Sequence, residues 1–157
     1  MINLKNRRRA IKTIGAVAAS PIIMPYLNLV HAQSATIPIG VALPMTGNAG
    51  AYGPDMAEAA KRTADLINRS GGILGGRKLQ LFIEDSESSA SVAANLTQKF
   101  INVHKCQSLV GYWGTPEGLS SRPIAIQNKV VLMVSSAANS ITEGDTQGYV
   151  WRFQMKA

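Results

Sequence analysis

Short apolar runs alternate with longer amphipathic segments along this chain, and that alternation restricts the fold more than any other feature. Buried strands are expected over 37–43, 78–85, 109–112, 130–134 and 149–153. Between the first four, apolar residues recur at three- and four-residue spacing over 54–69, 92–103 and 115–128, which is typical of helices. Because each connection is long enough to hold a helix, the pattern predicts βαβ units, an α/β fold with a parallel sheet covered on both faces.

Local signals support the expected helix boundaries. Pro54 suits a first helical position, where its missing N–H costs nothing, and Gly71-Gly72 ends the same helix. The sequence Thr115-Pro116-Glu117 is typical of a helix start, at which Thr115 can act as the cap. Thr115 therefore has two interpretations, as a structural cap or as a ligand-binding residue.

The first 32 residues have the order of a signal peptide. A basic start over 5–12 is followed by an uncharged stretch over 13–30 and by a small residue, Ala32. We expect cleavage after Ala32, a mature lobe over 33–157 and a periplasmic location, with a membrane anchor as the alternative. The 7–12 segment also fits the twin-arginine pattern, so this export route and the general secretory route both stay open.

Charge and cysteine content exclude several classes of function. The formal net charge is +7, but five of the sixteen Lys and Arg residues lie within 1–32, which holds no acid. The remaining eleven basic residues are offset by nine acidic residues, which leaves residues 33–157 with a formal net charge of +2. They are scattered among those acids, whereas a nucleic-acid surface needs clustered basic residues. The single cysteine, Cys106, excludes an intrachain disulfide and a cysteine-based metal site.

Polar loops follow the expected strands, at the edge of a parallel sheet where ligands bind. These loops span 44–53, 85–91, 111–115 and 135–140 and are rich in Gly, Ser, Thr, Asn and aromatic residues. Exposed backbone N–H groups and hydroxyls suit a carboxylate or another small polar group.

The same loops lack catalytic motifs. The 47–53 segment has neither dinucleotide-binding spacing nor a P-loop lysine, and the chain has no nucleophile elbow. His104 is expected on the surface at a helix end, and Glu84 and Asp85, as neighbours in a strand, point to opposite faces. The sequence therefore favours binding over enzymatic activity, and we predict no cofactor and no metal.

Several segments, taken in order, resemble one family. They are 39–47 followed by Ala51-Tyr52-Gly53, the helix end 65–68, the glycine turn 71–78, Glu84-Asp85, Val110-Gly111 with Thr115, and 134–137. They are similar to the opening strands and turns of periplasmic solute-binding proteins of the branched-chain amino-acid type. The resemblance covers 37–153 and implies the Rossmann-like N-terminal lobe of a type I periplasmic binding protein, with the chain ending before the second lobe.

The resemblance also implies residues that bind the ligand. Tyr52 corresponds to a tyrosine that lines the cleft, and Thr115 corresponds to a residue that binds the ligand's carboxylate. Ala137 and Asn139 correspond to residues that hold an amino acid. Ser136, at the matching strand end, either joins them or only satisfies the backbone of a turn.

Two departures from the family pattern bear on specificity. Asn139 stands where threonine is usual, and Tyr112-Trp113-Gly114 replaces a stretch of small residues. Trp113 therefore either lines the pocket or covers the lobe. These departures argue against a leucine-type ligand and leave an amide, an aromatic acid or another small organic molecule open.

The resemblance implies a solute-binding component of an ABC importer, whose two lobes enclose a small amino acid, amide or organic acid. Its partners would be that solute and an inner-membrane permease, and the full-length protein is expected to be a monomer. Two alternatives remain: a ligand-sensing receptor domain of the same fold without a transport role, and a fragment without function. An exported enzyme would need catalytic residues that the sequence lacks.

Overall fold

A computed structural model describes residues 36–154, and the predicted signal peptide lies outside these residues. The strands are β1 (Ile37–Leu43), β2 (Leu79–Asp85), β3 (Ser108–Gly111), β4 (Val131–Val134) and β5 (Val150–Arg152). The helices are α1 (Gly53–Arg69), α2 (Ala90–Asn102), α3 (Thr115–Gln127) and the short 3₁₀ helix η4 (Asn139–Ile141). Every strand and α-helix expected from the sequence is present, with boundaries shifted by one or two residues, and η4 was not expected.

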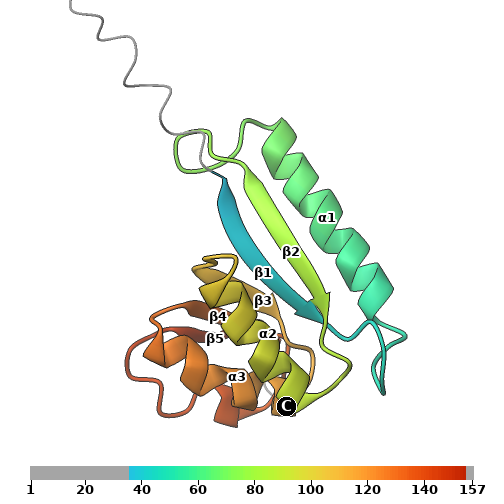
Figure 1. The fold of residues 1–157 in the computed structure, drawn as a ribbon, viewed down its shortest axis with the longest axis vertical. Helices are drawn as coiled ribbons and strands as arrows, with labels where there is room; N and C mark the ends of the chain where they lie inside the picture. Colours follow the sequence, from blue (N-terminus) through green and yellow to red (C-terminus); the bar gives the residue numbers. More distant parts are fainter. Residues whose placement is uncertain (1–35, 155–157) are drawn as a thin grey trace, which may run out of the picture. The chain divides into compact units, whose positions relative to one another are not determined.

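The five strands form one parallel sheet in the order β2-β1-β3-β4-β5. Helix α1 leads from β1 to its neighbour β2, whereas α2 leads back past β1 to β3. Because crossovers between parallel strands are right-handed, this reversal puts α1 on one face and α2 with α3 on the other. The predicted α/β fold of βαβ units is confirmed (Figure 1).

Alternate residues of β1 enter two separate cores. Val41 and Leu43 pack with Ala57 of α1, whereas Ala42 joins the larger core beneath α2 and α3. Gly40 also faces α2, and a Cβ there would lie 2.6 Å from Phe100 Cγ. Only glycine lets Phe100, which is fully buried, approach the strand this closely.

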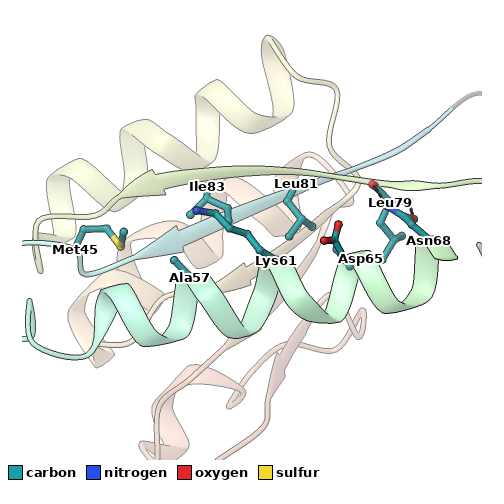
Figure 2. A pocket seen from close by; sticks show the side chains of 9 residues that line it. Met45, Ala57, Lys61, Asp65, Asn68, Leu79, Leu81 and Ile83 are labelled. Carbon is teal, nitrogen blue, oxygen red and sulfur yellow. Dashed lines mark hydrogen bonds between the residues drawn. The ribbon is translucent and has the colours of Figure 1, made fainter. Parts of the chain in front are cut away.

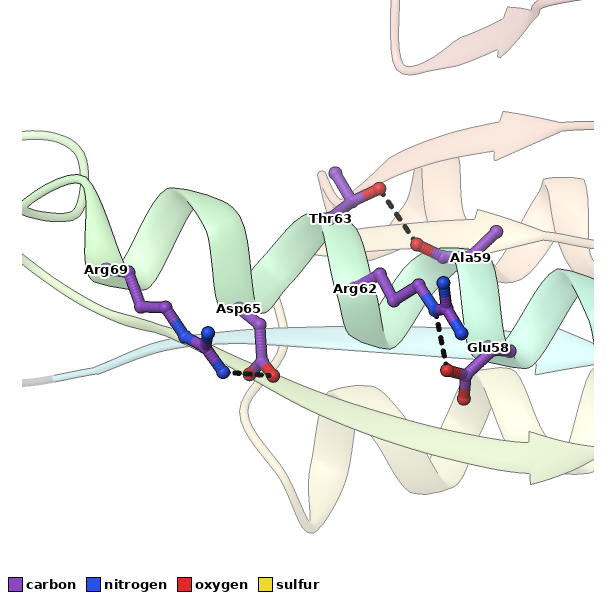
Figure 3. A network of polar contacts seen from close by, with 6 residues as sticks. All are labelled: Glu58, Ala59, Arg62, Thr63, Asp65 and Arg69. Carbon is purple, nitrogen blue, oxygen red and sulfur yellow. Dashed lines mark hydrogen bonds and ion pairs between the residues drawn. The ribbon is translucent and has the colours of Figure 1, made fainter.

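Helix α1 carries alternating charges on its outer side. Glu58 pairs with Arg62 at 2.7 Å, and Asp65 pairs with Arg69 at 3.7 Å, each four residues apart (Figure 3). Such exposed pairs support a helix only weakly, because solvent screens their charges. They belong to the stability of α1 and lie on its solvent side.

The expected helical cover on both faces is incomplete. On the face that carries α1, Val110, Met133 and Trp151 are neighbours in register across β3, β4 and β5. Helix α1 packs on β1 and β2, and Met133 and Trp151 remain 36% and 57% exposed. Within residues 36–154, this half of the sheet therefore presents apolar side chains to solvent, which corrects the sequence-based expectation.

No helix among the described residues is long and apolar enough to cross a membrane.

Candidate functional site

The carboxyl ends of β1 and β3 mark the point where the connections of the sheet reverse. In open α/β sheets, ligands bind in the crevice at such a topological switch point. Gly111 ends β3 with φ of 108°, and a Cβ there would lie 2.2 Å from the Ala42 carbonyl oxygen. Tyr112 follows with φ of 51°, so two successive residues in the left-handed region turn the chain out of the sheet at the switch point.

Aromatic rings from the two sides of the switch point stack on each other. Tyr52 comes from the β1–α1 loop and Trp113 from the β3–α3 loop. Their ring centroids are 5.1 Å apart and their planes are inclined by 25°. Tyr52 is 56% exposed and Trp113 is partly exposed, so the pair presents aromatic surface to solvent at this edge. Of the two interpretations of Trp113, this position favours a place beside the crevice.

Thr115 is the first residue of α3, and the cap position belongs to Gly114. The interpretation of Thr115 as the helix cap is therefore wrong. Its Oγ1 lies 2.7 Å from Ser136 Oγ, which follows β4. Ser136 is buried and also accepts the Ala138 N–H, so its own proton can go to Thr115. The Thr115 hydroxyl, which is partly exposed, then keeps its proton for a ligand.

Glu117 occupies part of the same helix start. It is only 3% exposed, and its Oε2 accepts the N–H of Gly114. Its Oε1 has no hydrogen-bond partner among the described residues. This carboxylate accepts an N–H that a bound anion would otherwise use. The start of α3 therefore offers a ligand the Thr115 hydroxyl, whereas its Gly114 N–H group is already occupied.

Tyr112 supports this arrangement from inside the lobe. Its side chain is fully buried, and its hydroxyl lies 2.8 Å from Thr97 Oγ1 of α2. Burial raises the pKa of the Tyr112 hydroxyl, which therefore stays protonated. Tyr112 anchors the β3–α3 loop, and its neighbour Trp113 supplies the surface.

Arg152, at the end of β5, is a site residue that the sequence analysis missed. Its Nη1 donates to the carbonyl of Ala137 and, at 3.1 Å, to Asn139 Oδ1. The two positions expected to hold an amino acid are thus both engaged by a guanidinium. Among the described loops and strand ends at this edge, Arg152 is the only basic residue. A single basic residue at a strand end was therefore the sequence signal that could have identified it.

Asp85 at the end of β2 fixes the first loop. Its Oδ1 accepts the N–H groups of Met45 and Thr46, and its Oδ2 accepts the Thr46 hydroxyl at 2.7 Å. Burial alone would raise the pKa of Asp85. The hydrogen bonds from Thr46, Glu87 and Met45 outweigh that effect and hold the pKa below its usual value. Glu84 points elsewhere and pairs with Lys99 at 2.6 Å, as expected for neighbours in a strand.

A groove lies away from this edge, between α1 and β2. Figure 2 shows its lining: an apolar floor, which includes Leu79, Leu81 and Ile83, with Lys61 and Asp65 at the rim. It holds about 430 Å³. Asn68, the remaining polar side chain, already binds the N–H and carbonyl of Leu79. No set of polar groups converges there, so the candidate site is the edge formed by Tyr52, Trp113, Thr115, Ser136, Ala137, Asn139 and Arg152.

His104 and the possible metal ligands add nothing to this edge. His104 follows the end of α2, is partly exposed, and stacks its ring on Phe82 with centroids 3.9 Å apart. Among residues 36–154, no three His, Cys, Asp or Glu side chains lie close enough together to hold a metal ion.

Known proteins share the fold of this lobe. The sequence model of a family described as periplasmic binding protein matches residues 36–157. No curated protein matches the chain in sequence. Among solved structures, the isoleucine complex of the branched-chain amino-acid transporter substrate-binding protein LivJ from Streptococcus pneumoniae is 26% identical, with a TM-score of 0.72. The match covers 78% of this chain and 34% of LivJ.

Two further structures match over similar spans. A leucine-binding protein, LivK, from Thermotoga maritima is 26% identical with a TM-score of 0.66, covering 77% of this chain and 33% of that one. A solute-binding protein of an ABC transporter from Rhodopseudomonas palustris, in complex with 3,4-dihydroxybenzoic acid, is 29% identical with a TM-score of 0.66, covering 77% and 32%. The chain thus spans about a third of the length of the structures it matches.

Proposed function

This chain belongs to the periplasmic binding protein family, and from that premise we propose that it is a ligand-binding lobe of the solute-binding component of an ABC importer. In this role it works outside the cytoplasm, with a partner lobe and an inner-membrane permease. The ligand is a small solute with a carboxylate, such as an amino acid or an organic acid, or a related amide. The ligands named for two similar structures, isoleucine and a dihydroxybenzoic acid, fall in these classes.

The observation that carries this proposal is the pairing of Thr115 with Ser136 at the switch point. A buried serine lies 2.7 Å from the threonine hydroxyl, and with the serine as the donor the threonine proton is free for an acceptor on the ligand. Trp113 of the stacked aromatic pair precedes Thr115 by two residues in the same loop, so this loop carries both a polar group and an apolar surface. Small-molecule sites generally combine a few fixed polar groups with apolar walls.

The test is a nuclear magnetic resonance titration of the 157-residue chain with L-amino acids, their amides, and aliphatic and aromatic carboxylates. We expect at least one class to give saturable shifts confined to the loops after β1, β3 and β4. Thr115→Ala should weaken that binding about tenfold, because a hydrogen bond to a charged group is lost. Thr63→Ala is the matched control, since its hydroxyl bonds only the Ala59 carbonyl on the outer side of α1 (Figure 3).

Two results would contradict the proposal. One is the absence of saturable shifts with every class of compound. The other is saturable shifts that map to the groove between α1 and β2 and are insensitive to Thr115→Ala.

A further inference from the structure

We infer that Arg152 and the Tyr52–Trp113 pair select an aromatic carboxylate that carries no α-ammonium group. This inference rests on the proposed function, because it names the ligand class of the same site. It follows from the charge at one end of the edge and from the ring surface at the other.

The first step concerns the acceptors that an amino acid needs. An α-ammonium group is a donor only, and it has to find carbonyl or carboxylate oxygens. In the loop after β4, the Ala137 carbonyl and Asn139 Oδ1 both accept from Arg152 instead. A second cation placed at these oxygens would lie next to the guanidinium, and like charges at such short range repel. The loop is therefore unfavourable to an ammonium group.

The second step concerns the carboxylate. Only Nη1 of Arg152 makes a hydrogen bond to the described residues, so the Nε and Nη2 donors are not used by residues 36–154. Arginine presents its donors in a planar fork that fits a carboxylate. Glu117 brings a negative charge to the start of α3, and an anion bound by Thr115 needs a nearby positive charge to offset it. Arg152 is the residue at this edge that supplies it.

The third step concerns the body of the ligand. Tyr52 and Trp113 stack nearly parallel across the switch point, and the exposed Tyr52 ring leaves room for a further planar group. Aromatic rings in offset stacks attract each other beyond what their area of contact supplies. An aliphatic side chain of the same size gains only the free energy that comes from its area of contact. The pair thus favours a flat ring over a branched aliphatic chain.

Two matched pairs of ligands separate these contributions on the 157-residue chain. 3-Phenylpropanoate and L-phenylalanine differ only in the α-ammonium group, and benzoate and cyclohexanecarboxylate differ in aromaticity. We expect 3-phenylpropanoate to bind about tenfold more tightly than phenylalanine. We expect benzoate to bind about threefold more tightly than cyclohexanecarboxylate, or better. Binding is followed by the backbone amides of the loops and by the indole N–H of Trp113, assigned with Trp113→Phe.

Variants of the chain test the named residues. Arg152→Gln should remove the preference for 3-phenylpropanoate, whereas Arg122→Gln should preserve it. Arg122 is the matched control because it also donates to backbone carbonyls, those of Ser140 and Glu143, neither of which is among the residues of the candidate site. Tyr52→Ala removes an exposed ring without touching the core, and it should abolish the preference for benzoate. If Arg152→Gln fails to fold, the inference is still tested by the two ligand pairs on the unmodified chain and by Tyr52→Ala.

The outcomes distinguish this inference from the proposed function. Phenylalanine or isoleucine binding as tightly as 3-phenylpropanoate would overturn the inference and leave the proposed function standing. Equal binding of benzoate and cyclohexanecarboxylate would overturn the role of the aromatic pair. If no amino acid, amide or carboxylate binds, both fail.

Discussion

Asp85 anchors the first loop of the site through four hydrogen bonds, from Met45 N–H, Thr46 N–H, the Thr46 hydroxyl and Glu87 N–H. All four favour the ionised carboxylate, which is why its pKa lies below the usual value despite burial. A carboxyl group whose folded pKa is depressed stabilises the fold fully above its unfolded pKa, near 3.9 for a typical Asp. That stabilisation is lost as the pH falls through the lower, folded pKa.

We therefore predict that the free energy of unfolding falls as the pH is lowered from about 5 to about 2, in part because Asp85 is protonated. Asp85→Asn should destabilise the fold by about 1 kcal/mol at neutral pH and should flatten this acid dependence. Denaturant unfolding at a series of pH values measures both effects. Asp55→Asn, at an exposed carboxylate of α1, controls for the loss of a surface charge. An unchanged acid dependence in Asp85→Asn would contradict the prediction.

Single residues also show where sequence reasoning succeeds and where it stops. The family resemblance singled out Tyr52, Thr115 and Ser136, and each lies in a loop after a strand end, which the topology brings to one edge. The partner of Thr115 was beyond prediction, since it lies 21 residues away and is fixed only by the packing of α3 against β4. Arg152 was missed because its hydrogen bonds reach back to a loop 13 and 15 residues earlier.

At the scale of elements, strands and helices were predictable because each carries its own local signal. β1 is continuously apolar, α1 has a proline in its first turn, and two positive-φ glycines follow the end of α1. Helix α3 is the exception, because Pro123 lies inside it and is exposed. Proline lacks the N–H that would bond the carbonyl of Leu119 one turn earlier.

We predict that Pro123→Ala stabilises the chain by about 1–2 kcal/mol, because it restores a helical hydrogen bond, less the entropy that proline removes from the unfolded state. Thermal unfolding followed by circular dichroism measures this as a rise in Tm. Pro54→Ala is the matched control, because a proline in the first turn of α1 interrupts no helical hydrogen bond. A lower Tm for Pro123→Ala would show that its ring makes contacts that outweigh the missing bond.

At the scale of the whole described lobe, the two faces of the sheet differ. The face beneath α2 and α3 is closed, whereas Met133 and Trp151 on the opposite face remain exposed. Sequence periodicity predicted cover on both faces because the strands are apolar on both sides. It could not show that the one helix on the second face, α1, extends only over β1 and β2.

Contiguous apolar surface of this kind binds hydrophobic dyes, and we predict that the 157-residue chain enhances the fluorescence of anilinonaphthalene sulfonate in its native state. Met133→Lys should reduce the enhancement severalfold, because it places a charge in the middle of the row formed by Val110, Met133 and Trp151. Leu66→Lys, at an exposed leucine on α1, should change it little. Equal effects of the two variants would show that the dye does not report the sheet face.

The four loops at the carboxyl edge come from different strands and are joined in pairs, the first to the second through Asp85 and the third to the fourth through Thr115 and Ser136. None of the candidate site residues belongs to either apolar core, so a heritable change at this rim leaves both cores intact. Under the proposed function, lineages with this lobe can exchange one ligand for another through a few substitutions at the rim, while selection keeps the interior constant. Substitution of Arg152 is the step at which we would look for such an exchange.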